Sequence, residues 1–599
     1  MYERSGQIIR QKFREYLLPT VLTSMAISMA SVVDGMIVGS LLGDMALAAV
    51  GLSGPVIFCI NLIYLLFAVG GLTCAAVAQG KRDFHFANQV FTLSIACGLG
   101  AMILFLMVMQ SVLRPLSLSL AGGDATLASM AESYLRPLLF TGPALMFSSG
   151  MAMFIRTDGR PKASAAIVMI ANAVNLVLDY VLIRFLNTGI AGAGLSTALG
   201  YVAGAVIVIP YLLNRKRSFR FVRPNSDAFK TLLLILKTGM PKGLIQACNL
   251  LRSLLINAII IAALGSMGMS TMTVCTNMLM ISNIFVGGIS DTLLPIIGVL
   301  YGERDAFGMR HAMKTARRVL AVCCIALVAF FMAAPQLMGI AFGINDPDAL
   351  AVVNPAIRMF ALYLPFSAFI LLHQNFYNTT ERRSLASTLV VLDGLLFVVP
   401  FAFLFSCVQA HLLWLCYATS GMCTLFTLVL LSRRIQREEG LHDLLLIREG
   451  EEFNCKFDFT IAANTEEAVR LSEKVLSLAE KNFDNVKLLN RIALVLEEMT
   501  VASVRYAHTE NTGFIDVFVC VTDEEVMIRM RDNGTPFNPL EYIPDENDGC
   551  ITDSIQLVKK LASRLEYSRQ LGFNTSVLTF EVEKCEADWI QSQYSPKNK

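Results

Sequence analysis

The sequence predicts a membrane all-α protein with twelve transmembrane helices in two parallel six-helix repeats, followed by a cytoplasmic α/β sandwich. Hydrophobic residues make up 55% of the chain and charged residues 16%, whereas soluble domains carry about 25% charged residues. From about Leu17 to Leu431 nearly the whole chain consists of apolar runs, each close to the roughly 20 residues that cross a bilayer. Charge returns after Arg433. We therefore expect two six-helix halves, residues 1–222 and 223–440, and a cytoplasmic domain over 450–599.

The basic residues set the expected topology, because Lys and Arg collect in cytoplasmic loops. The candidate spans are residues 17–42, 50–78, 88–112, 133–155, 163–186, 190–213, 233–263, 272–300, 318–343, 354–377, 384–406 and 410–432. Alternate connections between them hold basic clusters, namely Lys81 and Arg82; Arg156, Arg160 and Lys162; Arg215, Lys216, Arg217, Arg220 and Arg223; Arg304, Arg310, Lys314, Arg317 and Arg318; Arg382 and Arg383. This alternation places both termini in the cytoplasm.

An internal repeat supports two halves of equal orientation. The stretch Gly80-Lys-Arg-Asp83 reappears as Gly302-Glu-Arg-Asp305, an offset of 222 residues. At the same offset, Arg156-Thr-Asp-Gly-Arg160 falls on Asn378-Thr-Thr-Glu-Arg382. Each half then has six spans, and parallel repeats of this kind hold a substrate site at their interface. The sequence therefore favours a transporter over a channel.

Four polar residues of the first half are expected to meet inside the membrane. Asp34 and Asp179 lie about eight and seven residues before the outer ends of their spans, and Thr197 about seven residues after the start of the next span. A rise of about 1.5 Å per residue puts all three at one depth. Asn175 lies one turn from Asp179 on the same helix face. Intramembrane carboxylates are functional by default, because a mid-bilayer charge costs about 2.5–3.5 kcal/mol on insertion scales.

Two chemical roles are open for this group. Desolvation and a second carboxylate both favour the protonated carboxyl, so the pair could hold a proton or bind Na⁺ through its oxygens. The alternative is that these residues only hydrogen-bond neighbouring helices. In the second half, Asp291 and Asp393 lie toward the cytoplasmic side. They could form a gate or a second ion site, or pair with a base such as Arg252.

Residues 10–435 resemble the MATE (multidrug and toxic compound extrusion) transporters. The resemblance rests on Asp34-Gly-Met-Ile-Val-Gly39 with Leu47-Ala-Ala-Val-Gly-Leu52, and on Arg156-Thr-Asp-Gly-Arg-Pro-Lys162 with Asn172-Ala-Val-Asn-Leu-Val-Leu-Asp179. It implies that Asp34, Asn175, Asp179 and Thr197 bind the coupling ion, H⁺ or Na⁺. It further implies antiport of small organic compounds, often cationic or amphipathic, by a protein embedded in membrane lipid. Relatives in the wider superfamily flip lipid-linked sugars, so the cargo stays open.

The C-terminal region reads as an α/β sandwich, with strands near 453–461, 514–521, 525–531, 565–569 and 575–583 and helices near 466–482, 486–508 and 551–563. Its motifs are Leu496-Glu-Glu-Met-Thr-Val-Ala-Ser-Val-Arg-Tyr-Ala-His508, Asp532-Asn-Gly-Thr-Pro-Phe537 and Gly572-Phe-Asn-Thr575. They resemble the GHKL (Bergerat) ATPase module of anti-sigma-factor serine kinases. The resemblance implies a nucleotide site in which Asp532 and Gly534 form the adenine loop and Glu498 orients the attacking group.

Two departures from that family argue against kinase or ATPase activity. Ala502 stands where the family has an Mg²⁺-binding Asn, and Mg²⁺ neutralises charge in phosphoryl transfer. Ile551-Thr-Asp-Ser-Ile555 stands where a glycine-rich lid is expected, and glycines let backbone N–H groups approach phosphates. We therefore expect a degenerate domain that binds ATP weakly or not at all and serves a regulatory protein partner.

Composition excludes some other classes of function. The formal net charge of +2 gives no nucleic-acid footprint, and fourteen cysteines without a C-x-x-C pair give no zinc or disulfide framework. The leading prediction is a secondary exporter with H⁺ or Na⁺ antiport, without catalytic residues, in a bacterial inner membrane by analogy. The alternative is a membrane sensor whose transporter-like half controls an anti-sigma or serine kinase-like output.

Overall fold

The computed structural model describes residues 4–42, 46, 49–50, 53–121, 125–215, 217–224, 227–341, 347–441, 443–447, 455–479, 486–508, 513–521, 525–541 and 549–581. The chain divides into two compact units. The helical unit is Phe13–Ile447, and the second unit combines Met1–Lys12 with Arg448–Lys599. The sequence had assigned the first twelve residues to the first six-helix half.

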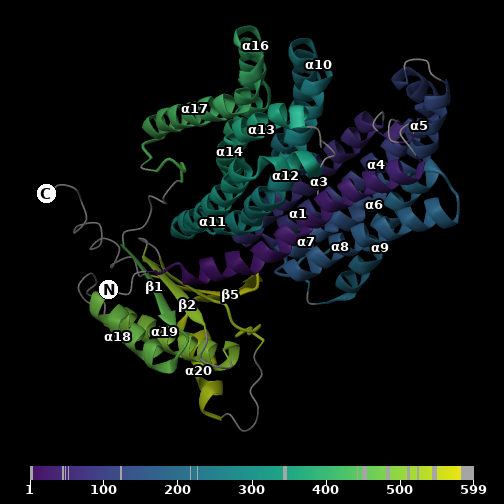
Figure 1. The fold of residues 1–599 in the computed structure, drawn as a ribbon. Coiled ribbons are helices and arrows are strands. Elements are labelled where there is room, and N and C mark those ends of the chain that lie inside the picture. Colours follow the sequence, from purple (N-terminus) through teal and green to yellow (C-terminus); the bar gives the residue numbers. More distant parts are fainter. Residues whose placement is uncertain are drawn as a thin grey trace. The chain divides into compact units, whose positions relative to one another are not determined.

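The helical unit contains two successive sets of helices (Figure 1). The first set is α1 (Gln7–Leu42), which begins in the second unit, α3 (Gly54–Gly80), α4 (Phe84–Leu120), α5 (Ala125–Leu138), α6 (Thr141–Leu145), η1 (Met146–Gly150), α7 (Met151–Thr157), α8 (Pro161–Tyr180), η2 (Val181–Phe185) and α9 (Ile190–Leu213). The second set is α10 (Ala228–Gly302), α11 (Ala306–Ala333), α12 (Pro335–Ala341), α13 (Pro347–Ala361), α14 (Tyr363–Thr379), α15 (Arg383–Val391), η3 (Leu392–Leu396), α16 (Val398–Val408), η4 (Ala410–Leu415) and α17 (Cys416–Glu439).

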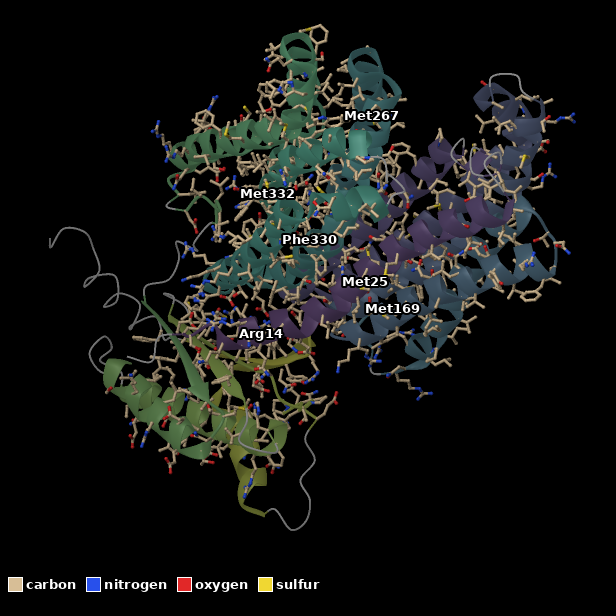
Figure 2. All side chains as sticks on the ribbon, in the orientation of Figure 1. Arg14, Met25, Met169, Met267, Phe330 and Met332 are labelled. Carbon is tan, nitrogen blue, oxygen red and sulfur yellow. The ribbon has the colours of Figure 1, made fainter. Side chains whose placement is uncertain are left out.

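Eleven helical stretches in the described part of the chain are long and apolar enough to cross a membrane. They overlap the last eleven predicted spans, from Gly54–Gly80 to Ala410–Glu439. The predicted first span lies within α1, a 36-residue helix that is not among the eleven. Large apolar side chains on these helices are exposed in the isolated chain, among them Met169 and Phe330 (Figure 2), as expected for surfaces that face lipid.

Helix α10 holds two predicted spans and turns back on itself. Its 75 residues are helical throughout, including the predicted connection at 264–271, which contains no proline that would end the helix. Cys74 on α3 donates a hydrogen bond to Thr238 on α10 at 3.4 Å, and Gly80 on α3 contacts Gly302 on α10. Thr238 and Gly302 would be about 96 Å apart on a straight helix, but Cys74 and Gly80 are separated by only about 9 Å. The two arms of α10 therefore both pack on α3.

The two halves meet at a symmetric crossing of repeat-related residues. A Cβ on Gly80 would lie 2.1 Å from the carbonyl oxygen of Val299, and a Cβ on Gly302 would lie 2.2 Å from that of Val77. Both pairs of equivalents, Gly80 with Gly302 and Val77 with Val299, are separated by the predicted offset of 222 residues. The crossing therefore lies on the internal two-fold axis, and only glycine permits this approach of two backbones.

Local structure repeats at the same offset, which confirms the predicted internal duplication. Asp83 accepts a hydrogen bond from the N–H of Phe86 at 2.9 Å and caps α4, as Asp305 accepts from Gly308 at 2.9 Å and caps α11. The equivalent residues Arg82 and Arg304 both have positive φ, 61° and 55°, and so do Gly159 and Glu381, 83° and 62°. The helical unit has two apolar cores: one draws on residues 38–235 and includes the start of α10, and the other draws on residues 256–418.

We predict that Gly80→Ala and Gly302→Ala each destabilise the helical unit, because the added methyl must separate two backbones. Overpacking costs about 1–3 kcal/mol, and backbone yields less readily than side chains. Thermal unfolding in detergent measures the effect. Gly100→Ala on α4 is the control, because a Cβ there meets nothing within 4 Å. Equal melting temperatures for Gly80→Ala and Gly100→Ala would contradict the crossing.

The second unit contains a five-stranded antiparallel sheet in the order β1-β2-β3-β5-β4. Its elements are β1 (Cys455–Ala462), α18 (Thr465–Ala479), α19 (Val486–Ala507), β2 (Phe514–Val521), β3 (Glu525–Asp532), α20 (Gly549–Leu561), β4 (Arg564–Gln570) and β5 (Phe573–Glu581). The three helices pack through one apolar core against one face of the sheet (Figure 1). The predicted order of strands and helices is confirmed.

The opposite face of this sheet binds the N-terminal segment. Phe459 and Val517 point into the helix-side core, so period-two alternation puts Asp458 and Asp516 on the other face. There Arg4 donates from Nε to Asp516 at 3.0 Å and from Nη1 to Asp458 at 3.3 Å. The Arg4 side chain is only 3% exposed. The N-terminus is therefore an integral part of the second unit.

Further contacts extend the attachment toward the glycine loop after β3. Asn533 donates from Nδ2 to Oε1 of Gln11 at 2.9 Å. The ammonium of Lys12 lies 4.9 Å from the ring centroid of Phe573, a cation–π contact. Ile8 and Ile9 on the same helical turns are buried. The sheet is thus covered on both faces.

We predict that Arg4→Ala destabilises the second unit by about 3–5 kcal/mol, the usual cost of removing one partner of a buried ion pair. Hydrogen exchange on the full-length chain measures this as faster exchange of the β1 and β2 amides. Arg10→Ala is the matched control, because Arg10 is exposed on the same segment. Unchanged exchange in Arg4→Ala would show that the segment does not hold the sheet.

Candidate functional site

The polar residues predicted to meet in the first half lie together between α8 and α9. Asn175 donates from Nδ2 to Oδ2 of Asp179 at 3.2 Å and to Oγ1 of Thr197 at 3.3 Å. Asp179 is completely buried and Asn175 nearly so. Asn175 and Asp179 share a face because they are four residues apart on α8. The short connection from η2 to α9 brings Thr197 back against them.

Asp34 on α1 completes the group. Its carboxyl lies within hydrogen-bonding reach of the Asp179 carboxyl. Its Oδ1 is buried and has no hydrogen-bond partner in the described part of the chain. Asp34, Asn175, Asp179 and Thr197, which the sequence placed at one depth, are therefore brought together by three different helices.

Two further residues belong to this group and were not predicted. Ser196 donates its hydroxyl hydrogen to Oδ1 of Asp179, and its oxygen lies 3.5 Å from the amide nitrogen of Asn175. Tyr134 on α5 is buried and interacts electrostatically with both carboxyl groups. Ser196 could have been found from its position beside Thr197. Tyr134 gives no such signal, because the comparison of depths covered only the spans that carry Asp34, Asp179 and Thr197.

The chemistry of the group follows from its oxygens. Two carboxyl groups in contact inside an apolar bundle cannot both stay ionised without a positive charge between them. A proton shared by Asp34 and Asp179 satisfies this condition, and it would also satisfy the orphaned oxygen of Asp34. A small hard cation would do the same, since carboxylate and hydroxyl oxygens are the ligands such ions prefer. The residues present fit either ion.

The two carboxylates of the second half do not form one site. Asp291 accepts hydrogen bonds from Lys242 and Asn375, both at 3.0 Å. Asp393 accepts from the hydroxyl of Tyr363 at 2.8 Å. Tyr363 and Asn375 are twelve residues apart on α14, which corresponds to about 18 Å along the helix. The shared cytoplasmic depth expected for the two residues is therefore wrong.

The partners of these two carboxylates differ in kind. Asp291 forms an ion pair with Lys242 and also interacts electrostatically with Arg156. Arg252 interacts electrostatically with Asp393, in agreement with one of the predicted alternatives, and lies over the ring of Tyr417, 5.6 Å from its centroid. Both carboxylates thus have internal partners, and Oδ1 of Asp393, like Oδ1 of Asp34, is buried without a hydrogen-bond partner in the described part of the chain.

In the glycine loop of the second unit, the carboxylate of Asp532 accepts hydrogen bonds from neighbouring residues of the same unit. Asp532 accepts from the hydroxyl of Ser503 at 2.8 Å, from the amide of Asn574 at 2.8 Å and from the N–H of Gly534 at 2.9 Å. A Cβ on Gly534 would lie 2.2 Å from the carbonyl oxygen of Ala507. Here the glycine lets the loop pack on the end of α19, and the carboxylate holds the loop closed.

The other residues of the expected nucleotide site lie on α19 and α20. Glu498 is half-buried on α19, and Ala502 one turn later is buried and offers no oxygen. The Ile551–Ile555 stretch, which stands where the family has a glycine-rich lid, lies in the first turns of α20. From Asp553 onward the backbone N–H groups of this stretch have intrahelical acceptors, so this part of the stretch is not a loop that could close over phosphates.

Comparison with known proteins identifies relatives of the helical unit. The MatE family model matches residues 19–181 and again residues 241–404, so the two matches begin at the repeat offset. The chain is 22% identical over 385 residues to the multidrug export protein MepA of Staphylococcus saprophyticus, covering 63% of this chain and 83% of that protein. It is 20% identical over 422 residues to MepA of Staphylococcus aureus, covering 69% and 92%.

Solved structures share the same fold. An outward-facing multidrug resistance MATE family transporter matches with a TM-score of 0.68 and 22% identity, covering 74% of this chain and all of that one. A transporter of the MOP superfamily from Pyrococcus furiosus matches with a TM-score of 0.67 and 21% identity, covering 74% and 100%.

Proposed function

The chain belongs to the MatE family, and on that premise we propose that it is a secondary exporter that drives small organic compounds outward by antiport of H⁺ or Na⁺. One observation carries the proposal: the carboxyl pair Asp34–Asp179, with one orphaned oxygen, surrounded by Asn175, Ser196 and Thr197. The coupling ion binds there. The MepA relatives are named multidrug export proteins, which supports a chemically broad cargo.

Comparison with the second half favours an ion-binding role for Asp34 and Asp179 over a purely structural role. The 222-residue offset places Ile256 opposite Asp34 and Phe401 opposite Asp179. Ile256 is buried in the core of the second half, and Phe401 packs against that core. A six-helix half of this fold therefore holds together with apolar residues at both positions. Structural cross-linking of helices does not explain why the first half keeps two acids, whereas ion binding does.

Coupling requires that the ion bind one conformation more tightly than the other, because a ligand shifts an equilibrium only by its difference in affinity. Without a cation, Asp34 and Asp179 repel and α1 moves away from α8. With a proton or Na⁺ between them, the two helices close. This change in the first half alters the opening between the halves and releases cargo outward.

We predict that Asp34→Asn and Asp179→Asn each reduce ion-driven transport by roughly tenfold or more, the usual range of coupling between sites. The asparagine amide keeps the shape of the side chain but removes the charge that the ion compensates. Efflux of a fluorescent cation from proteoliposomes under an imposed pH or Na⁺ gradient measures this. Asp227→Asn is the control, because Asp227 is exposed and pairs only locally with Lys230 at 2.9 Å.

One outcome of this assay would contradict the proposal, and two controls protect its interpretation. Normal transport with normal ion dependence in both variants would remove the pair from the coupling step. A loss of folded protein would be recognised by thermal unfolding of the same samples. Abolished transport in Asp227→Asn would show that the assay does not report on the carboxyl pair.

For the second unit, we propose a degenerate GHKL-like domain that regulates the exporter through a cytoplasmic protein partner and does not hydrolyse ATP. The support is that Asp532 already accepts three internal hydrogen bonds and that Ala502 cannot bind Mg²⁺. We place the protein in the bacterial inner membrane, with both termini in the cytoplasm.

We predict that the purified full-length chain shows no MgATP hydrolysis above that of its Glu498→Gln variant, and no transfer of phosphate to a bound protein. Release of labelled phosphate measures the first, and transfer of label to co-purified protein measures the second. Nucleotide-dependent activity that Glu498→Gln abolishes would instead support a sensor with kinase output.

A further inference from the structure

A basic pocket lies at one membrane end of the second half, away from the carboxyl pair. It has a volume of about 650 Å³ and is lined by Lys237 and Met240 of α10, Ile435 of α17, and the turn and first residues of α15 from Glu381 to Ser387. Pockets of about 300–1,000 Å³ are the usual size for small ligands. The membrane-spanning stretch Arg383–Val408 begins at this pocket and Ala410–Glu439 ends near it, so it lies where helices leave the bilayer.

Two of the four charged side chains are already neutralised. Arg382 makes a two-pronged contact with Glu439, at 2.8 and 2.7 Å. Glu381 lies 3.8 Å from Lys81. Lys237 and Arg383 have no acidic partner within ion-pair distance in the described ranges, and the Nε of Arg383 is buried without a hydrogen-bond partner. The pocket therefore holds two uncompensated positive charges and one orphaned donor.

The remaining lining combines hydroxyl and apolar groups. Ser384 and Ser387 lie beside Arg383 on α15, whose first N–H groups have no side-chain cap. Free N–H groups at a helix start favour anions, and the guanidinium fork matches a phosphate. Met240, Leu385 and Ile435 supply an apolar wall. A ligand in which a phosphate is joined to hydrocarbon chains would fit both sets of groups. Membrane lipids have this structure and are present at this depth of the bilayer.

We propose that this pocket binds the headgroup of an anionic phospholipid, with the phosphate at Arg383 and Lys237 and the upper acyl chain against Met240, Leu385 and Ile435. Basic pockets between membrane helices suit such headgroups. The long stem of Lys237 allows its ammonium to reach the headgroup region from within the span. The site is independent of the coupling ion and links lipid composition to the arms α10, α15 and α17.

Lipid binding to the purified full-length chain tests the proposal. Native mass spectrometry measures retention of phosphatidylglycerol and of phosphatidylcholine with the same acyl chains. Wild-type protein should retain phosphatidylglycerol preferentially, and Lys237→Gln with Arg383→Gln should reduce that preference by roughly tenfold or more. Lys230→Gln is the matched control on the same helix, since Lys230 is 83% exposed and already paired with Asp227.

Three results would overturn the proposal. Equal retention of the two lipids by wild-type protein would deny recognition of the headgroup charge. An unchanged preference in the double variant would place lipid binding elsewhere. Displacement of phosphatidylglycerol by an equal concentration of glycerol 3-phosphate would assign the pocket to a water-soluble phosphate compound. The exposed Lys237 keeps the test usable if the double variant misfolds, because Lys237→Gln alone should weaken the preference several-fold.

Discussion

The contact between two carboxyl groups inside an apolar bundle constrains everything else that this protein can do. Two like charges about 4 Å apart repel by about 4 kcal/mol even at an effective dielectric of 20. That energy corresponds to roughly a thousandfold bias against both acids of such a pair being ionised together. The proposed coupling follows from this repulsion, because a proton or cation between the acids would favour the packing of α1 against α8.

The internal two-fold symmetry shows which features of the first half have no counterpart in the second, and the two acids are among them. Where the halves cross, Gly80 and Gly302 are equivalent, make equivalent contacts and lie too close to tolerate a side chain. The acids break that symmetry, because Ile256 and Phe401 stand at the corresponding places. In the proposed function, the first half changes its packing with the bound ion, while the crossing at Gly80 and Gly302 joins it to the second half.

Sequence reasoning succeeded where a signal was local or periodic. Apolar runs gave the spans, a constant offset gave the duplication, and helix rise placed Asp34, Asn175, Asp179 and Thr197 together. It failed for Asp393, because depth counted from span ends does not identify which neighbour a side chain meets, here Tyr363. The role of Arg4 was not predicted: it is buried against Asp458 and Asp516. A partner more than 450 residues away leaves no trace in local pattern.

The most direct test of the central claim is infrared difference spectroscopy of the purified protein between acidic and alkaline buffer, with and without Na⁺. We predict a protonated carboxyl band that disappears in alkaline buffer and whose frequency or pH response changes in both Asp34→Asn and Asp179→Asn, since either substitution ends the sharing of the proton. Na⁺ should also remove the band if it is the coupling ion. The same band with the same pH response in both variants would contradict the account.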